Sequence, residues 1–492
     1  MIYKNPILHF DFSDPDVIRD KDDFYMIASS FNMLPGLPIL HSKNLVDWEI
    51  INYAINKLDD RFNLVVHGEG IWAPSIRKHN GLFYIVYPDP DKGIFEIHTD
   101  NLYKEFSKPR CLISGRGYED PCPIWVEDKC YITFAFVKSR IGFNSKIAVI
   151  EAKTDLSSTI GEYKIVYDGT NDNPTIEGPK FNYRNGYYYI MAPAGSVKGG
   201  WQTCLRSKNP FGPYESKIVL YQGDSLINGP HQGALIDLDD SLEKFAFIHF
   251  QDKRAYGRIV HLEPVKFVND WPICGESKDY ILAGTPVSEH EYLVNVCSDY
   301  KVMISDKFKD KKLSFMWQRP SNVDDFYSFN NKLIFKFNKT EYNNRIDLNP
   351  YSIYTKIPAL EFDISTKFDF KNMNVGDHIG FVVMGQKYKA IEFAKESNKI
   401  IVSLIDGEFN EVNKVINSFE IDDNNVIVNA QFRNKDIYDL LYTIHVNGIK
   451  VFNKEKAYAG RWIGANLGYY AYTTGDNPGT CDILYYNTNI IK

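Results

Sequence analysis

The sequence predicts an all-β protein in which a five-bladed β-propeller is followed by a β-sandwich. Three observations lead to this prediction: aromatic strand-like segments recur along the first half of the chain, X-Pro pairs precede them at a constant offset, and helical periodicity is scarce. Aromatic residues make up 15% of the chain, and such residues favour strands. With 492 residues the chain exceeds one ordinary core, so we expect two domains.

The repeat is clearest when the aromatic strands are aligned on Tyr25, Tyr84, Tyr131, Tyr189 and Phe247. These positions are separated by 59, 47, 58 and 58 residues, and each unit contains several short strand-like runs. Five units of about four strands fit the blades of a propeller. A solenoid would need a shorter and stricter repeat.

An X-Pro pair stands ten residues ahead of four of these aligned positions. The four segments are Ser13-Asp14-Pro15, Trp72-Ala73-Pro74, Glu119-Asp120-Pro121 and Glu177-Gly178-Pro179. Proline cannot donate to a β-ladder and is confined to sheet edges, and the innermost strand of a blade is such an edge. One X-Pro pair alone would indicate only a turn, but four in register place their neighbours beside the central channel.

The repeat fades after about residue 275, and the charged, irregular segment from about Ser288 to Lys312 is interpreted as a connector. Strand-like alternation then resumes with regular spacing, which is typical of an all-β sandwich. The predicted domains are residues 1–300 for the propeller and 313–492 for the sandwich.

Charge and composition exclude several classes of partner. A net charge of −7 argues against a nucleic-acid partner, and no apolar run approaches the length of a membrane span. The N-terminal residues lack the apolar stretch of a signal peptide, and the seven cysteines show no C-x-x-C spacing. We therefore expect a cytoplasmic protein without nucleic-acid or membrane partners, unless the chain has been trimmed.

Carboxylates at three equivalent points of the repeat indicate acid–base chemistry. Glycoside hydrolysis commonly uses two carboxyl groups, one to protonate the departing oxygen and one to activate water or attack the sugar. Asp14 and Glu177, from the first and fourth blades, can face each other across the channel mouth, with Asp120 from the third blade nearby. A third carboxylate raises the pKa of a neighbouring general acid by like-charge repulsion.

Motifs between residue 5 and about 275 follow an order that is known from one family. They are Asn5-Pro6-Ile7-Leu8, Phe12 to Arg19, Gly70 to Pro74, Glu119-Asp120-Pro121, Ile176 to Lys180, Gly229 to Gly233, Ile248 to Asp252 and Tyr256-Gly257-Arg258. This order resembles glycoside hydrolase family 43. The remainder, beginning with Phe315-Met316-Trp317-Gln318, resembles the sandwich of its xylosidase and arabinofuranosidase branches.

The resemblance implies an inverting mechanism. Asp14 would be the general base that activates water, and Glu177 would be the general acid. Asp120 would tune the pKa of the acid and orient it.

Further residues match substrate and cation positions of the family. Arg258 matches a substrate-contacting arginine, and Phe31 and Trp72 match walls of the terminal-sugar pocket. His231 matches a histidine on the channel axis that coordinates calcium or another cation in several members, directly or through water. His249 is a further candidate for substrate binding. For both histidines the alternative is a hydrogen-bonded core position, and Trp72 could instead fill the core.

We therefore expect an exo-acting inverting glycoside hydrolase that releases terminal α-L-arabinofuranose, with β-D-xylosidase activity, from arabinoxylan-derived oligosaccharides. The alternatives are a β-xylosidase acting mainly on xylo-oligosaccharides, an endo-acting arabinanase and a catalytically silent carbohydrate-binding protein. A fructan hydrolase is disfavoured because Ser13-Asp14-Pro15-Asp16 replaces the Asn-Asp-Pro-Asn-Gly of that group. The expected partners are oligosaccharides from arabinoxylan or xylan, and calcium is the one expected cofactor.

Overall fold

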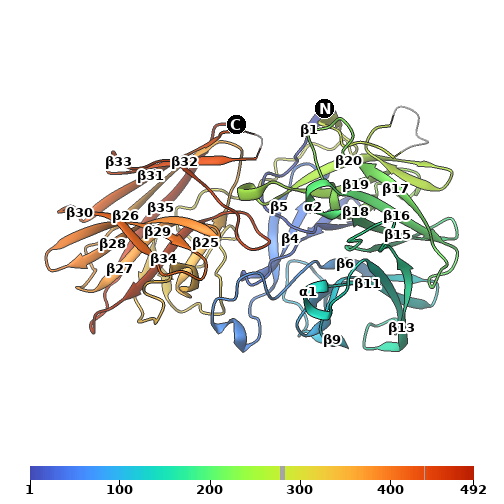
Figure 1. The fold of residues 1–492 in the computed structure, drawn as a ribbon, viewed down its shortest axis with the longest axis horizontal. Helices are drawn as coiled ribbons and strands as arrows, with labels where there is room; N and C mark the ends of the chain where they lie inside the picture. Colours follow the sequence, from blue (N-terminus) through green and yellow to red (C-terminus); the bar gives the residue numbers. More distant parts are fainter. Residues whose placement is uncertain (278–282, 437) are drawn as a thin grey trace.

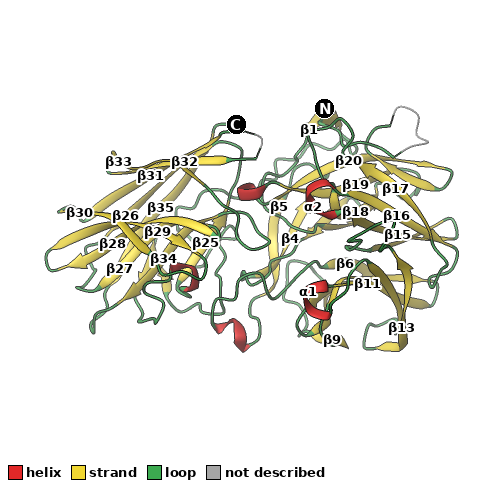
Figure 2. Cartoon of the chain, in the orientation of Figure 1, coloured by secondary structure: helices red, strands yellow, loops and turns green. Residues whose placement is uncertain are grey.

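The computed structural model describes residues 1–277, 283–436 and 438–492, and it contains two all-β bodies (Figures 1 and 2). The first, blue to green in Figure 1, is the propeller, and the second, orange to red, is the sandwich. The described helices are short: α1 (Lys138–Ile141), α2 (Ser196–Gly199), η1 (Asp60–Asn63), η2 (Arg254–Tyr256) and η3 (Ile346–Leu348). Within the described ranges, none has the length and hydropathy of a transmembrane span.

The propeller consists of five antiparallel sheets of four strands, each sheet built from consecutive strands. Blade one contains β2 (Asp16–Asp20), β3 (Asp23–Ile27), β4 (Gly36–Ser42) and β5 (Glu49–Ile55). Blade two contains β6 (Ser75–His79), β7 (Leu82–Asp89), β8 (Gly93–Thr99) and β9 (Arg110–Ser114). Blade three contains β10 (Tyr118–Val126), β11 (Lys129–Phe136), β12 (Lys146–Ala152) and β13 (Thr159–Asp168).

The remaining two blades follow the same plan. Blade four contains β14 (Lys180–Arg184), β15 (Tyr187–Ala194), β16 (Trp201–Ser207) and β17 (Glu215–Tyr221). Blade five contains β18 (His231–Asp237), β19 (Phe245–Asp252), β20 (Arg258–Val268) and β21 (Trp271–Cys274). The first strands of the blades contact one another in a closed ring, β2 to β6 to β10 to β14 to β18 and back to β2. The predicted five-bladed propeller is confirmed.

Apolar clusters between neighbouring blades hold this ring together. Each of five clusters combines side chains from two adjacent blades, as the pairs Ile39 and Ile85, Val86 and Ile132, Cys122 and Ile190, Met191 and Phe247, and Phe24 and Ile248 illustrate. Burying such side chains contributes roughly 1.5–3 kcal/mol each. The channel-lining strands are thus fixed from behind by the blade interfaces.

The X-Pro pairs lie where the innermost strands begin. Pro15, Pro74 and Pro179 each directly precede the first strand of a blade, and Pro121 lies in β10 where the pairing register with β11 shifts. Asp14 and Asp120 both have a φ of 55°, a left-handed conformation that aspartate tolerates better than most residues. The acids therefore stand at the strand starts, beside the channel, as the repeat predicts.

The sandwich packs a seven-stranded sheet against a six-stranded sheet. The larger sheet has the order β23 (Tyr327–Phe329), β24 (Leu333–Lys336), β35 (Thr480–Ile490), β26 (Phe362–Asp369), β31 (Asn425–Asn434), β32 (Leu440–Val446) and β33 (Ile449–Lys456). The smaller has the order β25 (Ser352–Lys356), β34 (Asn466–Thr473), β27 (Asp377–Met384), β28 (Lys387–Glu396), β29 (Lys399–Glu408) and β30 (Lys414–Ile421). Tyr469 and Tyr470 are fully buried, so they belong to the core as expected.

The chain between the two bodies touches both. β1 (Ile2–Lys4) at the N-terminus pairs with β22 (Glu289–Glu291), which ties the segment after blade five to the propeller. Asp306 forms a bridge with Tyr486, and Phe308 is part of the sandwich core. The charged run predicted to be a connector therefore packs on the sandwich.

Asp11 joins the propeller to the sandwich. Its Oδ1 accepts a hydrogen bond from the backbone N–H of Arg258 at 2.8 Å, and its Oδ2 accepts one from Gly464 at 2.9 Å. Its carbonyl oxygen accepts a hydrogen bond from Nζ of Lys356 at 2.6 Å. These bonds fix the sandwich loop between β33 and β34, residues 457–465, against the propeller.

Two ion pairs connect β2 with β6 and provide a matched test of what holds blades one and two together. The Asp16 side chain is fully buried and accepts from Arg77 Nη1 at 2.7 Å and from the Ile76 N–H at 2.8 Å. Asp20 and Lys78 form the other pair at 2.6 Å, with both side chains partly exposed. Removing one member of a buried pair leaves an uncompensated charge, whereas an exposed pair contributes little.

We expect Asp16→Ala to lower the free energy of unfolding by about 3–5 kcal/mol and Asp20→Ala by about 0–1 kcal/mol. Urea denaturation followed by tryptophan fluorescence measures both. Equal effects of the two substitutions would contradict the assignment of Asp16 as a structural anchor between the blades.

Candidate active site

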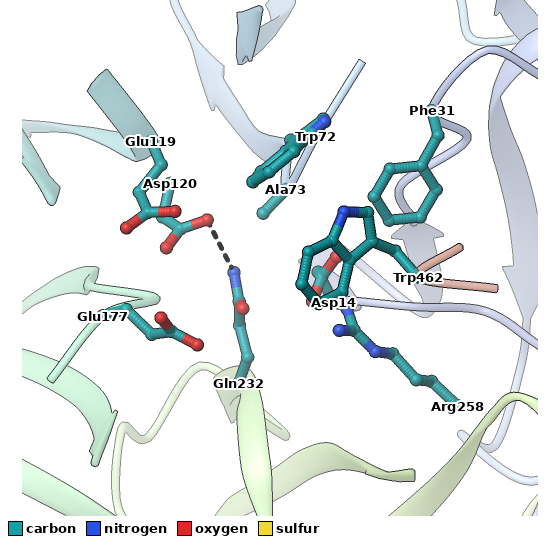
Figure 3. A pocket seen from close by; sticks show the side chains of 10 residues that line it. All are labelled: Asp14, Phe31, Trp72, Ala73, Glu119, Asp120, Glu177, Gln232, Arg258 and Trp462. Atoms are coloured by element: carbon teal, nitrogen blue, oxygen red, sulfur yellow. Dashed lines mark hydrogen bonds and ion pairs between the residues drawn. The ribbon is translucent and has the colours of Figure 1, made fainter. Parts of the chain in front are cut away.

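Ten residues line a cavity of about 110 Å³ at the mouth of the propeller channel (Figure 3). They are Asp14, Phe31, Trp72, Ala73, Glu119, Asp120, Glu177, Gln232, Arg258 and Trp462. Nine come from the starts of inner strands or from nearby propeller segments, and Trp462 comes from the sandwich loop. In Figure 3 the carboxyl groups form two sets, with Asp14 on one side and the other three acids on the opposite side.

Asp14 is held by three donors. Its Oδ2 accepts hydrogen bonds from the hydroxyls of Ser13 at 2.7 Å and Ser29 at 2.5 Å. Its Oδ1 accepts from Nη1 of Arg258 at 3.0 Å, and the same Nη1 also donates to the Ser13 hydroxyl at 2.6 Å. Burial alone would lower the pKa of Arg258, but the nearby Asp14, Asp252 and other carboxylates outweigh it and raise that pKa. Arg258 is therefore a fixed positive charge against Asp14.

Glu119 and Asp120 are buried side by side on the opposite wall. Asp120 Oδ2 accepts from the Gly178 N–H at 2.7 Å, and its Oδ1 accepts from Nε2 of Gln232 at 3.2 Å. Burial, followed by the charges of Glu177 and Asp14, raises the pKa of Asp120 to about 7. Burial and the neighbouring carboxylates also raise the pKa of Glu119 well above its usual range.

Glu177 is the most accessible carboxyl group of the cavity. Its side chain is 33% exposed, whereas Asp14, Glu119 and Asp120 are all less than one tenth exposed. Its Oε1 is hydrogen-bonded to Nε2 of His231 at 2.8 Å. A substrate entering the cavity can reach this carboxyl group, while His231 restricts its orientation from behind.

Gly178, directly after Glu177, has a backbone that only glycine fits well. Its φ is +59°, and a Cβ atom there would lie 2.9 Å from the side chain of Gln232. A larger residue would push either Gln232 or the Glu177 peptide out of place.

Three aromatic side chains form the apolar walls. The rings of Phe31 and Trp72 meet edge to face with centroids 6.2 Å apart, and Trp72 and Trp462 meet similarly at 6.1 Å. The indole N–H of Trp72 donates to the Gly68 carbonyl at 3.1 Å, which fixes its ring plane. Phe31 is buried, whereas Trp462 is 48% exposed. Trp462 thus extends the wall outward from the propeller.

The structure brings most of the residues singled out in the sequence to one place. Six of them line the cavity: Asp14, Phe31, Trp72, Asp120, Glu177 and Arg258. His231 lies behind them as the hydrogen-bond partner of Glu177.

His249 does not belong to this cavity, so the prediction that it binds substrate is corrected. Its side chain is fully buried in β19, and its Nε2 pairs with Oε1 of Glu263 at 3.2 Å. Its ring also stacks on His261 with centroids 5.3 Å apart. The alternative of a hydrogen-bonded strand position fits this residue.

Sequence reasoning missed Glu119, Gln232 and Trp462. Glu119 and Gln232 stood inside the family motifs, next to Asp120 and His231, but nothing in the sequence assigned them a function. The one signal for Trp462 is its surroundings in the sequence. A large aromatic residue is unusual in a glycine-flanked segment typical of an exposed loop, Gly460-Arg461-Trp462-Ile463-Gly464. Its place in the cavity depends on how the sandwich docks.

The residues around His231 supply too few ligands to hold calcium directly, so the cation predicted here stays a prediction in its water-mediated form. Calcium takes six to eight oxygen ligands. His231 is buried and its Nε2 is bonded to Glu177, which leaves only Nδ1, without a hydrogen-bond partner. Within residues 1–277, 283–436 and 438–492, no three His, Cys, Asp or Glu side chains are grouped so as to hold a metal.

Comparisons with known proteins agree with this architecture. The family model for glycosyl hydrolases family 43 matches residues 3–272, and the model for the β-xylosidase C-terminal concanavalin A-like domain matches residues 305–488. A protein of Xylanibacter ruminicola with a provisional β-xylosidase name is 38% identical over 327 residues, which are 66% of this chain and 60% of the relative.

One further curated relative and one solved structure match this chain over different lengths. A non-reducing end α-L-arabinofuranosidase of Bacteroides ovatus is 30% identical over 224 residues, 44% of this chain and 41% of the relative. The matched segments thus cover 60% or less of the length of the Xylanibacter and Bacteroides ovatus relatives. The crystal structure of a xylan β-1,4-xylosidase from Bacillus halodurans shares the fold, with a TM-score of 0.84 and 18% identity over 99% of this chain and 100% of that one.

The first family model alone covers more than half of the chain, in the same segment that forms the propeller and supplies nine of the ten cavity residues. This protein therefore belongs to glycosyl hydrolase family 43 and carries a β-xylosidase-type C-terminal domain.

Proposed function

We propose that this protein is an exo-acting inverting glycoside hydrolase that releases terminal α-L-arabinofuranose, with β-D-xylosidase activity, from arabinoxylan-derived oligosaccharides. One observation carries the proposal: Asp14 and Glu177 lie on opposite sides of a single small cavity with aromatic walls. A small cavity of this kind suits one terminal sugar better than the middle of a long chain. Family membership supports glycosidic bonds as the substrate class.

In the proposed mechanism Asp14 accepts a proton from a water molecule as that water attacks the anomeric carbon. Its oxygens already accept from Ser13, Ser29 and Arg258, so the carboxylate is oriented before the water binds. Glu177 on the opposite side gives a proton to the departing oxygen. Attack and departure on opposite faces invert the anomeric configuration, and each acid–base group contributes roughly 10²–10⁴-fold to the rate.

Asp120 positions the acid from two directions. One carboxylate oxygen accepts from the Gly178 N–H, in the peptide bond that directly follows Glu177. The other accepts from Gln232. The neighbour of Gln232 in the chain, His231, is hydrogen-bonded to Glu177. Asp120 is thus suited to keep the Glu177 carboxyl group aimed at the leaving oxygen.

The β-xylosidase alternative has comparable support. The match of the C-terminal domain to a β-xylosidase model and the Xylanibacter relative favour xylose, and the Bacteroides ovatus relative favours arabinofuranose. The two sugars present similar hydroxyl arrangements, so one pocket can serve both.

The proposed function is tested by hydrolysis of an aryl α-L-arabinofuranoside and an aryl β-D-xyloside, measured side by side. We expect both to be cleaved, with the arabinofuranoside preferred, and a reversed preference would favour the β-xylosidase alternative. Proton NMR of the first-formed sugar should show the anomer opposite to that of the substrate. Retained configuration would overturn the roles given to Asp14 and Glu177.

Glu177→Gln separates an enzyme from a silent sugar-binding protein. Without the transferable proton, we expect turnover of unactivated xylo- or arabino-oligosaccharides to fall by about 10²–10⁴-fold, while sugar affinity measured by calorimetry stays within about tenfold. Glu215→Gln, on the exposed outer strand β17 of the same blade, is the matched control and should leave both unchanged. Unchanged turnover in Glu177→Gln would exclude it as the acid.

Asp120→Asn should make the protein more stable than the wild type by an amount that grows as the pH rises, and it should reduce activity. The folded pKa of Asp120 is raised to about 7, so its stabilising contribution is complete below the unfolded value of 3.8 and is lost as pH rises through 7. Asparagine avoids this loss, so the advantage of the variant in free energy of unfolding should grow by on the order of 2 kcal/mol between pH 5 and 8.

Turnover of the same variant should fall at least tenfold, the order expected for the loss of one positioning contact, because the NH2 group that replaces one oxygen cannot accept the hydrogen bond made there by Gly178 or Gln232. Thermal unfolding across pH, together with kcat and KM at each pH, measures both effects. A variant that is uniformly less stable than the wild type would contradict the charge repulsion described for this site.

A further inference from the structure

A second cavity, of about 950 Å³, lies away from the active site and shares none of its lining residues. It is bounded by the N-terminal segment around His9, by β19 and β20 of blade five, and by the segment around Val287. Leu360 and Lys492 of the sandwich complete its wall, so the cavity lies where the two domains meet.

Buried nitrogen atoms without partners face this cavity. The His261 side chain is 1% exposed, and neither of its ring nitrogens has a hydrogen-bond partner. Nδ1 of His9 is likewise buried and without a partner. In any protonation state at least one of the two unpartnered His261 nitrogens carries a hydrogen, and a buried donor without an acceptor is costly. His9 can present an Nδ1–H to the same cavity in one of its two tautomers. His261 therefore calls for a ligand that accepts hydrogen bonds.

Lys253 adds a buried ammonium group to the same cavity. Its side chain is 7% exposed, and its ammonium group lies 5.3 Å from the centre of the Tyr256 ring. None of the ion pairs found among the described residues includes Lys253. Burial lowers the pKa of Lys253. Burial and then the Lys253 charge lower the pKa of His9 to about 4, and burial, His249, His9 and Lys253 lower that of His261.

Exposed charged residues lie at the rim of the cavity, and a buried lysine lies in its interior. The carboxylates that line it, Asp224, Glu276 and Glu289, are all exposed, as are Lys4 and Lys492. The groups that lack partners are the buried nitrogens. Glu263, a buried carboxylate behind the wall, is already bonded to Asn5, His249 and the Val287 N–H, so among the described residues it does not pair with Lys253. A metal ion would be repelled by the ammonium group of Lys253, whereas an oxyanion would satisfy all three side chains.

We propose that this cavity is a binding site for an oxyanion, held by Lys253, His9 and His261. Two sources share this chemistry: inorganic phosphate or sulfate, and the carboxylate of an acidic sugar such as glucuronate. A ligand here would contact blade five and the sandwich together, so binding should also stabilise the interface between the domains.

Isothermal titration calorimetry of the full chain with inorganic phosphate, and separately with glucuronate, tests the site. We expect saturable binding of one equivalent of at least one anion and none with neutral xylose at the same concentration. Tighter binding of phosphate would identify a mobile inorganic ion, and tighter binding of glucuronate an acidic sugar. Absence of saturable binding with both anions would overturn the proposal.

Two substitutions locate the site. Lys253→Met and His261→Phe keep the side-chain volume but remove donors, and each should weaken anion binding about tenfold or more, the order expected for one charge-assisted hydrogen bond. Lys244→Met, on an exposed lysine outside the cavity, should bind as the wild type does. Wild-type affinity in both cavity variants would overturn the proposal.

A readout on the wild-type chain keeps the test decisive if a variant fails to fold. Addition of the bound anion should shift the ring proton resonances of His9 and His261 in NMR spectra, while those of His79 on blade two, outside the cavity, stay in place. Movement of the His79 resonances alone would place the anion elsewhere and reject the site.

Discussion

Repulsion among four carboxyl groups in one small cavity is the constraint that organises this molecule. At an effective dielectric constant near 20, two charges about 4 Å apart repel by about 4 kcal/mol. The four carboxyl groups differ in how many hydrogen-bond donors and positive charges offset this repulsion. Asp14 receives an arginine and two hydroxyl groups, while Asp120 and Glu119, which have fewer donors, respond with raised pKa values. The walls of the cavity are therefore electrically different, which is the condition for separate base and acid roles.

The propeller makes such a cluster possible because no blade has to hold it alone. Asp14, Asp120 and Glu177 come from three blades, and each stands where an inner strand begins. The apolar clusters between the blades lie behind these strands and fix them independently of the cavity. Acids that are unfavourable for stability can therefore be kept in place for their chemistry, since the stability is supplied elsewhere in the ring.

The parts that could be predicted from sequence were those with a local physical cause. Proline at a constant offset placed the inner strands and, with them, Asp14, Asp120 and Glu177. Two histidines of blade five, His231 and His249, could not be distinguished in this way. His231 begins an inner strand and reaches Glu177, whereas His249 lies in the second strand and pairs with Glu263 inside the blade. Which face of a strand a histidine occupies depends on register, and register appears only in the structure.

Trp462 shows why the sandwich belongs to the active site rather than beside it. Its loop is held by Asp11, whose two carboxylate oxygens accept from the backbone of Gly464 in the sandwich and of Arg258 in the propeller. Arg258 in turn bonds Asp14, so a single carboxylate links the position of an aromatic wall to that of the base. Any shift of the sandwich must strain these bonds or move the wall and the base together. The docking of the second domain thus sets the shape of the cavity, and contacts of this kind lie beyond what local sequence patterns can indicate.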